Sequence, residues 1–293
     1  GLRQKFSLLA CLAGTLIAIV SIIGCYTSYN NLSDTLESEI SAAVDAQGKD
    51  LDTWLMSKGV SAAYLADLLG NIGDINQMKN RELLSLTTSD KTIAEVTIGL
   101  QDKFLFGYHA GDFTGKIDPT IRQWYKDART KDALTFTDAY IDGFTGQLIL
   151  SAVAPIKVNG QFVGATCVDV TLDVLNEQVR KLRYRGEGDG IIVERTGTLL
   201  ATTTDRGVKT VQEIPGIGDH FNEMLEKGNG YFDLPKDEKF GDRVFAYTTL
   251  KSTGWIVGIA VSDDFLFAPL QKMLLTYGVL VSVGLVLMIL ACL

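Results

Sequence analysis

Cysteine and histidine are scarce in this chain. Its 293 residues include four cysteines and only two histidines, His109 and His220. Three cysteines lie in long apolar runs at the two ends, and Cys167 lies alone in an apolar stretch. This distribution matches neither a disulfide framework nor the spacing of metal ligands. We therefore expect no metal site and no cofactor, and we interpret Cys167 as a small core residue.

Catalytic motifs are missing as well. The chain contains no G-x-S-x-G or H-E-x-x-H pattern, and its glycine-rich segment 186–190 lacks the lysine of a phosphate-binding loop. Ser151 and Thr166 lie on predicted strands, but the sequence indicates no histidine partner that would activate either hydroxyl. We predict that the chain is not an enzyme, and a membrane-tethered extracellular hydrolase is the weaker alternative.

Charge is absent from both ends of the chain. No charged residue occurs in 6–29 or in 273–293. Each run is long enough to cross a hydrocarbon core of about 30 Å as a helix, and the first is too long for the apolar core of a signal peptide. Arg3 and Lys5 precede the first run and place the N-terminus in the cytoplasm. We predict a two-pass protein of the plasma (inner) membrane, with its large middle segment extracytoplasmic and an output region beyond Leu293.

A surplus of positive charge is also lacking, because the formal net charge is −8. An acidic segment outside the membrane stays soluble and gives no basic surface for phosphates. We therefore expect no nucleic-acid partner.

Proline is absent between residues 30 and 70, where apolar residues recur three, four or seven positions apart. This spacing is typical of an amphipathic helix. We predict one helix over 30–70 that continues out of the membrane. Its apolar stripe from Leu32 to Leu55 covers the helix's own domain, pairs with a second copy, or does both. We expect a homodimer with this stripe as the seam and with Leu36 and Ile40 in contact across it.

Strand patterns and turn residues in the rest of the chain indicate two units, each an antiparallel meander. Asn159–Gly160 is a strong hairpin signal between two strands of the first unit. The glycine-rich segment 186–190 separates this unit from a smaller one. The predicted domains are 1–29 (cytoplasmic tip and first transmembrane helix), 30–70 (long helix), 71–185 (membrane-distal unit with the ligand pocket), 186–272 (membrane-proximal unit) and 273–293 (second transmembrane helix).

Arg122, Trp124 and Tyr125 lie within four residues of one another. The guanidinium of Arg122 presents a planar fork of donors that matches a carboxylate, and the two aromatic rings offer apolar walls with polar edges. If Asp142 and Asp169 face the same cavity, their carboxylates can accept hydrogen bonds from an ammonium group, and the set suits a zwitterion. From spacing alone, a structural salt bridge between Arg122 and one of these aspartates, with the aromatics in the core, is an equal alternative.

This layout and this order of residues resemble the double Cache (dCache) sensor domains of bacterial and archaeal transmembrane receptors. The resemblance rests on D-P-x-x-R-x-W-Y from Asp118, on Y-x-D from Tyr140 and on Asp169 at the end of a strand. It implies an α+β fold in which two PAS-like antiparallel-sheet modules are strung on the long N-terminal helix and flanked by two transmembrane helices. In amino-acid-binding members, the arginine and tryptophan hold the ligand carboxylate, and the later tyrosine and aspartates hold its amino group. The ligand-binding residues implied here are Arg122, Trp124, Tyr125, Tyr140, Asp142 and Asp169.

The resemblance also implies a function, the ligand-sensing input region of a receptor most like the methyl-accepting chemotaxis proteins, with an amino-acid-like ligand. Amino-acid-binding members usually carry a tyrosine before the Asp-Pro pair, whereas this chain has Ile117, and it has Gln123 where proline is common. The loss of one hydroxyl contact leaves an amine or a small carboxylate as alternative ligands. The input region of a sensor histidine kinase or of a cyclic-dinucleotide enzyme is the alternative function. A third is a vestigial pocket in a domain that senses through a periplasmic binding protein.

Overall fold

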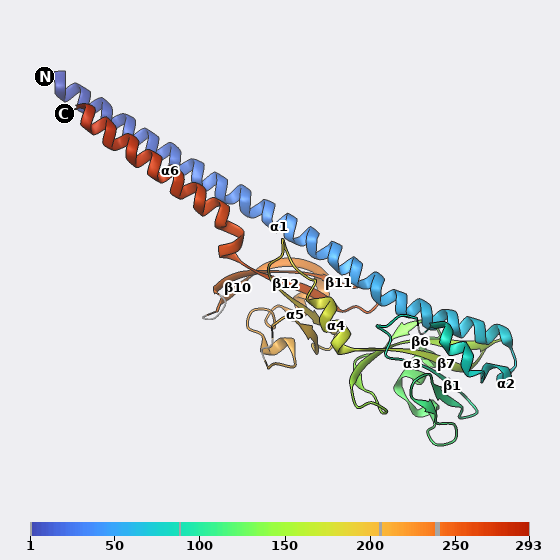
Figure 1. Ribbon diagram of the computed structural model, residues 1–293. Helices are drawn as coiled ribbons and strands as arrows, with labels where there is room; N and C mark the ends of the chain where they lie inside the picture. Colours follow the sequence, from blue (N-terminus) through green and yellow to red (C-terminus); the bar gives the residue numbers. More distant parts are fainter. Residues whose placement is uncertain (1, 88, 205–206, 238–240, 293) are drawn as a thin grey trace.

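One helix spans the whole length of the molecule (Figure 1). The computed structural model describes residues 2–87, 89–204, 207–237 and 241–292. Helix α1 (Leu2–Ile72) has 71 residues, which corresponds to about 105 Å at 1.5 Å per residue. Helix α6 (Asp263–Cys292) runs back beside the N-terminal part of α1, so the two ends of the chain lie together. The helix predicted over 30–70 is therefore confirmed as part of one continuous helix.

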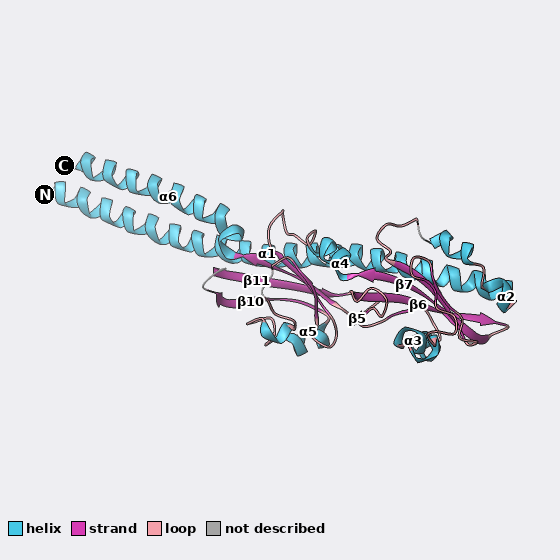
Figure 2. Cartoon of the chain, turned by 60° about the horizontal axis from the view of Figure 1, so that its bottom comes forward, coloured by secondary structure: helices cyan, strands magenta, loops and turns pink. Residues whose placement is uncertain are grey.

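A seven-stranded antiparallel sheet, the larger sheet, lies against the C-terminal part of α1 (Figures 1 and 2). Its strand order is β3-β2-β1-β7-β6-β4, and β5 also pairs with β6. Asn159 and Gly160 join β6 to β7 with φ angles of 48° and 78°, the positive values that a tight hairpin turn requires. The strands are β1 (Glu95–Leu100), β2 (Leu105–Gly107), β3 (Gly111–Asp112), β4 (Thr135–Phe136), β5 (Tyr140–Ile141), β6 (Leu148–Val158) and β7 (Gln161–Thr171).

Helices cover both faces of the larger sheet (Figure 2). On one face, α1 packs through Leu55, Ala62 and Leu65, all fully buried. On the other face, α3 packs through Trp124 and Tyr125. The short helices of this part of the chain are α2 (Ile75–Met78), the 3₁₀ turns η1 (Arg81–Thr87) and η2 (Pro119–Ile121), α3 (Gln123–Lys131) and α4 (Leu172–Val179).

A five-stranded antiparallel sheet, the smaller sheet, follows along α1 in the order β10-β11-β12-β8-β9. Phe221 and Met224 of helix α5 pack on one of its faces against Phe245, and α1 lies on the other (Figure 2). Its elements are β8 (Asp189–Val193), β9 (Leu199–Thr202), the 3₁₀ turn η3 (Val211–Glu213), α5 (Phe221–Lys227), β10 (Asn229–Asp237), β11 (Gly241–Thr249) and β12 (Ile256–Ser262). Strand β12 leads directly into α6, which links this sheet to the C-terminal apolar run.

The predicted fold class is confirmed. The chain is an α+β protein in which two antiparallel sheets lie along a long N-terminal helix. Both apolar runs lie in helices, α1 and α6, that are long and apolar enough to cross a membrane by length and composition. Cys167 is 1% exposed and is a core residue, as the sequence indicated.

The apolar stripe of α1 covers the chain's own elements, which is one of the two roles predicted for it. Leu36, Ile40 and Leu55 are each no more than 3% exposed within a single chain, because α1 lies on both sheets and along α6. The prediction that the stripe from Leu32 to Leu55 forms a seam with a second copy is therefore wrong. The amphipathic pattern shows which face of a helix is buried, but it does not show what buries it.

Candidate functional site

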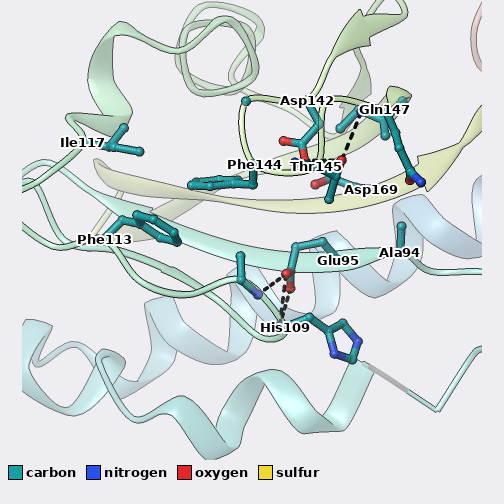
Figure 3. Close-up of a pocket in the computed structure, with 13 residues that line it drawn as sticks. Ala94, Glu95, His109, Phe113, Ile117, Asp142, Phe144, Thr145, Gln147 and Asp169 are labelled. Atoms are coloured by element: carbon teal, nitrogen blue, oxygen red, sulfur yellow. Dashed lines mark hydrogen bonds between the residues drawn. The ribbon is translucent and has the colours of Figure 1, made fainter.

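A cavity of about 510 Å³ opens in the larger sheet between β1, β7 and two loops (Figure 3). One loop contributes His109 and the residues that follow β3, and the other joins β5 to β6. Figure 3 shows an acidic end and an apolar end. The acidic end holds Glu95, Asp142 and Asp169, and the apolar end holds Phe113, Ile117 and Phe144.

Strand register brings the acidic end together. Glu95 on β1 lies directly opposite Asp169 on β7, and Asp169 lies directly opposite Ser151 on β6. Residues directly opposite each other on neighbouring strands point to the same face of a sheet. Asp142 approaches from the loop after β5, so three carboxylates from three parts of the chain line one cavity.

Asp169 is the buried carboxylate of the site, with 6% of its surface exposed. Its Oδ1 accepts hydrogen bonds from Ser151 Oγ at 2.5 Å and from Cys167 Sγ at 3.1 Å. Among the described residues, Oδ2 has no donor, although Asp169 lines the cavity. Burial raises the pKa of Asp169 to about 7; the bonds from Ser151 and Cys167 oppose this rise, and the charges of Asp142 and Glu95 add to it.

The other two carboxylates stabilise the loops that form the walls. Glu95 accepts hydrogen bonds from the backbone N–H groups of His109 and Ala110, at 2.9 and 2.6 Å, and so anchors the loop before β3 (Figure 3). Asp142 Oδ2 accepts from the backbone N–H and the hydroxyl of Thr145, at 2.8 and 2.7 Å. The structure places no donor on Asp142 Oδ1 in the part of the chain that it describes. The cavity thus presents one unpaired oxygen each from Asp142 and Asp169.

The apolar end is built from two loop phenylalanines. The ring centroids of Phe113 and Phe144 lie 4.4 Å apart, and Ile117 lies beside them (Figure 3). Ile117 stands where amino-acid-binding relatives usually carry tyrosine, and here it extends an apolar wall. This end of the cavity can receive a hydrocarbon group, but it offers no polar partner from these three side chains.

Arg122 lies one layer behind the cavity wall. It caps the N-terminus of α3 with an extended backbone, and its guanidinium rests against Gly143, where an added Cβ would meet Nη2 at 3.0 Å. Gly143 itself lines the cavity. In the described part of the chain, Arg122 forms no ion pair with Asp142 or Asp169. The alternative of a structural salt bridge at Arg122 is therefore wrong.

Trp124 and Tyr125 lie in the packed layer between α3 and the sheet. They are 7% and 1% exposed, with ring centroids 5.7 Å apart, and Tyr125 meets Phe162 edge to face at 5.4 Å. Burial raises the pKa of Tyr125 to about 12, and its hydroxyl has no hydrogen-bond partner among the described residues. Neither ring belongs to the cavity lining. The ligand contacts that the resemblance implies for both residues stay predictions.

Tyr140 contacts the site indirectly. Its hydroxyl lies 2.8 Å from Ser151 Oγ, which in turn binds Asp169. Burial raises the pKa of Tyr140 well above its usual range, and the nearby Cys167 and Asp169 add to the effect. Of the six predicted site residues, Asp142 and Asp169 line the cavity, Arg122 contacts the lining residue Gly143, and Tyr140 contacts Ser151, which binds Asp169.

Sequence reasoning missed Glu95 and the role of Ser151. Glu95 is the one charged residue of its strand, E-V-T-I-G-L, and that isolation was a usable signal. Ser151 gave no signal as a binding residue, because its role depends on the register of β6 against β7. His109 is exposed at the cavity mouth, and within the described residues no three His, Cys, Asp or Glu side chains are placed to hold a metal.

Comparisons with known proteins agree over most of the chain. The model of the Cache domain (dCache_1) matches residues 26–270. The chain is 22% identical to the methyl-accepting chemotaxis protein PscA of Pseudomonas syringae pv. tomato over 282 residues, and 23% identical to the methyl-accepting chemotaxis protein PctB of Pseudomonas aeruginosa over 284 residues. These alignments cover 91% and 92% of this chain and 43% of each relative, so the chain spans less than half the length of either.

Solved structures share the fold. The ligand-binding domain of the Pseudomonas fluorescens chemoreceptor CtaA in complex with L-leucine superposes with a TM-score of 0.66 at 22% identity, covering 81% of this chain and 99% of that domain. The extracellular domain of the putative histidine kinase mmHK1S-Z2 superposes with a TM-score of 0.64 at 18% identity, covering 78% and 98%. Similarity at this level of identity establishes the fold.

Proposed function

The chain belongs to the Cache domain family, and from this premise we propose that it is the ligand-sensing input region of a transmembrane chemoreceptor. Two relatives that align with nearly all of this chain are methyl-accepting chemotaxis proteins. The site supports sensing rather than catalysis: its carboxylates are bonded to the chain's own loops and hydroxyls, and no histidine–hydroxyl pair is found among the described residues that line the cavity.

The ligand is a small molecule with an ammonium group, and an amino acid is the first choice. One observation carries this proposal: a buried carboxylate, Asp169, lies at a cavity of about 510 Å³ with one oxygen that has no donor in the described part of the chain. An ammonium group has three donors and no acceptor, so it can satisfy Asp169 and Asp142 together. The side chain of the ligand lies at the apolar end of the cavity, against the rings of Phe113 and Phe144.

The described residues that line the cavity include no lysine or arginine to bind the carboxylate of the ligand. The guanidinium of Arg122 rests against Gly143 of the cavity lining. We propose that a shift of the loop 142–147 when the ligand binds moves Gly143 aside and lets Arg122 reach the ligand carboxylate. A ligand then shifts the equilibrium between two states, which is the condition for signalling by binding.

The two apolar helices deliver the signal. We propose that α1 and α6 each cross the membrane, that both sheets lie outside the cytoplasm, and that the larger sheet is the membrane-distal one. A movement of the larger sheet reaches the membrane directly through α1, because the two pack along Leu55, Ala62 and Leu65. The proposed receptor works as a homodimer.

The test is calorimetric titration of the whole chain in lipid nanodiscs with the L-amino acids. For each amino acid that binds, its affinity is compared with that of two analogues. One is the amine that lacks the carboxylate, and the other is the carboxylic acid that lacks the amino group. We expect the amino acid and the amine to bind and the acid without an amino group not to bind, because the carboxylates of Asp142 and Asp169 accept hydrogen bonds from an ammonium group.

Arginine variants give the matched control. Arg122→Ala should weaken binding of the amino acid about tenfold or more, as loss of a charged hydrogen bond does, and leave the amine unchanged. Arg129→Ala, an exposed arginine on the same helix, should change neither. Binding of the acid without the amine would contradict the proposed orientation of the ligand.

The input region of a sensor histidine kinase is the second candidate, because the extracellular domain of mmHK1S-Z2 shares the fold over 78% of this chain. The two candidates share the ligand site and differ in the output. Incubation of the complete receptor with radiolabelled ATP separates them: a histidine kinase labels itself, and a chemoreceptor requires a separate kinase.

A further inference from the structure

We propose that Ser151 is a positioning residue that holds Asp169 with one oxygen toward the cavity, so that an ammonium ligand binds only as Asp169 gives up a proton. The binding half of this inference rests on the function proposed above. The positioning half concerns the unliganded chain and can be tested without any ligand.

The geometry assigns the donors. Ser151 is fully buried, and its single hydroxyl proton goes to Asp169 Oδ1 at 2.5 Å. Because that proton is used, the hydroxyl of Tyr140 must donate to Ser151 Oγ, at 2.8 Å. Cys167 Sγ is also directed at Oδ1, at 3.1 Å. Every donor therefore converges on Oδ1, and Oδ2 is left to the cavity.

The backbone fixes Ser151 in this place. The Ser151 N–H donates to Thr137 Oγ1 at 3.0 Å, and the Thr137 N–H donates to the Ser151 carbonyl at 2.9 Å. Ser151 lies directly opposite Asp169 in the β6–β7 register. The serine hydroxyl is thus part of the rigid sheet, whereas Asp142 comes from a loop. A group on a rigid strand is suited to orient its neighbour before a ligand arrives.

Among the described residues that line the cavity around Asp169, none is a lysine or an arginine. The titratable groups that face it are Glu95 from β1, Asp142 from the β5–β6 loop and His109 at the mouth, with Tyr140 behind Ser151 and Cys167 on its own strand. Gly143 separates Arg122 from the cavity. The carboxylate is therefore buried beside like charges, and these conditions favour its protonated form.

An ammonium ligand favours the ionised form of Asp169 over the protonated form. Burial holds the pKa of Asp169 at about 7 in the unliganded chain, and an opposite charge at Oδ2 favours the ionised form. Below that pH the carboxyl must release its proton when the ammonium binds, so affinity falls as the pH falls through about 7 and levels off above it. The proton passes to the solvent, and no covalent bond changes except the O–H of Asp169.

The test follows the infrared carbonyl band of protonated Asp169 against pH in the unliganded whole chain in nanodiscs. Asp169→Asn identifies the band by its loss. We expect Ser151→Ala to move the titration midpoint upward by about one pH unit, because it removes a hydrogen bond to the charged form. Tyr140→Phe should move it less, because this hydroxyl acts through Ser151. Thr166→Val removes a buried hydroxyl that donates to Ala62 on α1 and should leave the midpoint unchanged.

A midpoint that is the same in Ser151→Ala and in the native chain would overturn the inference. Addition of n-butylammonium, a charged head with an apolar tail, should lower the midpoint in the native chain; an unchanged midpoint while calorimetry records binding would overturn the proton release. Failure of every amine and amino acid in calorimetry would instead contradict the proposed function, and the Ser151 titration would still decide the positioning role.

Discussion

Some buried polar side chains of this molecule line the cavity, and others lie in the packed interior away from it. The hydrogen-bond partners of the two groups differ. Asp169 has donors on one oxygen and the cavity at the other. Tyr125 and Lys58 are buried away from the cavity, where a polar group needs a partner to offset its loss of water. The second group gives two predictions about stability.

Tyr125→Phe should keep or raise the stability of the unliganded chain. The hydroxyl of Tyr125 is buried and has no hydrogen-bond partner among the described residues. Folding therefore takes this hydroxyl out of water without replacing its hydrogen bonds, and the phenylalanine variant avoids that free-energy cost. We expect the free energy of unfolding to rise by up to about 1 kcal/mol, measured by denaturant unfolding with circular dichroism. Lower stability would show that the hydroxyl has a partner. A loss of ligand affinity would show that Tyr125 moves to the ligand, as the resemblance implies.

Asp90→Ala should destabilise the chain by about 1–3 kcal/mol, because it leaves Lys58 buried without its partner. Lys58 is 2% exposed on α1, pairs with Asp90 and lies 4.9 Å from the ring of Trp54. The Asp90 side chain is 40% exposed, so solvent screens the pair and the loss is smaller than for a fully buried pair. Lys58→Met removes the buried charge as well and should cost less than Asp90→Ala. Equal losses for the two variants would contradict the desolvation argument.

The same pair predicts a dependence on pH. Burial raises the pKa of Asp90, but the hydrogen bonds from Lys58 and Thr92 outweigh it and bring the pKa to about 2, below the usual 3.8. A carboxyl with a lowered pKa contributes stability above its unfolded pKa and loses it as the pH falls toward the folded value. The difference in stability between the native chain and Asp90→Ala should therefore shrink between pH 4 and 2.

Part of the candidate site could be predicted at the residue scale, and the rest depends on register. Asp142 and Asp169 were predicted from the motif order that the chain shares with dCache domains, and both line the cavity. Glu95 and Ser151 join them only through strand pairing across 74 and 18 residues of chain, which local patterns do not specify. Trp124 and Tyr125 look alike in a sequence whether they face a ligand or a core.

At the scale of elements, helix α1 decides how a second copy can approach. Its apolar stripe is covered by the chain's own sheets, so a homodimer must use the opposite face. Outward residues recur there with helical spacing: Ala42, Ala46, Lys49, Thr53, Val60 and Tyr64 are all exposed. Val60 and Tyr64 are each 59% exposed and are the large apolar residues of this face.

Cysteine crosslinking in membranes tests the corrected seam. Single variants Val60→Cys and Tyr64→Cys should form dimers on mild oxidation in a background without the native cysteines, because both positions are exposed. Leu36→Cys and Ile40→Cys should not, since each is buried against the chain's own elements. Crosslinks at Leu36 and Ile40 without any at Val60 and Tyr64 would restore the original seam.

Elements with strong local signals were the predictable ones. The hairpin turn at Asn159–Gly160 was predicted, and it joins β6 to β7, because an Asn-Gly turn acts locally. The faces of α1 were harder. A pattern of apolar residues is the same whether a sheet or a second helix covers it.

At the scale of the whole molecule, both sheets pack against the single long helix α1. Helix α1 carries the larger sheet on one part and the smaller sheet on another, and α6 returns beside its apolar end (Figure 1). Tyr29 of α1 stacks on Phe267 of α6 with ring centroids 5.1 Å apart. This contact joins the helices just where the smaller sheet gives way to the apolar run, and a displacement of α1 against α6 there is the motion that the proposed signalling would require.

The most direct test of this account is the heat of ligand binding to the whole chain in nanodiscs, compared between the native sequence and Asp169→Asn. The account predicts binding of an ammonium-bearing ligand at one site per chain, lost or reduced at least a hundredfold in Asp169→Asn, because a buried charge pair would be broken. Asp233→Asn, an exposed carboxylate of the smaller sheet, should bind as the native chain does. Native affinity in Asp169→Asn would contradict the account, because the ligand would then bind elsewhere.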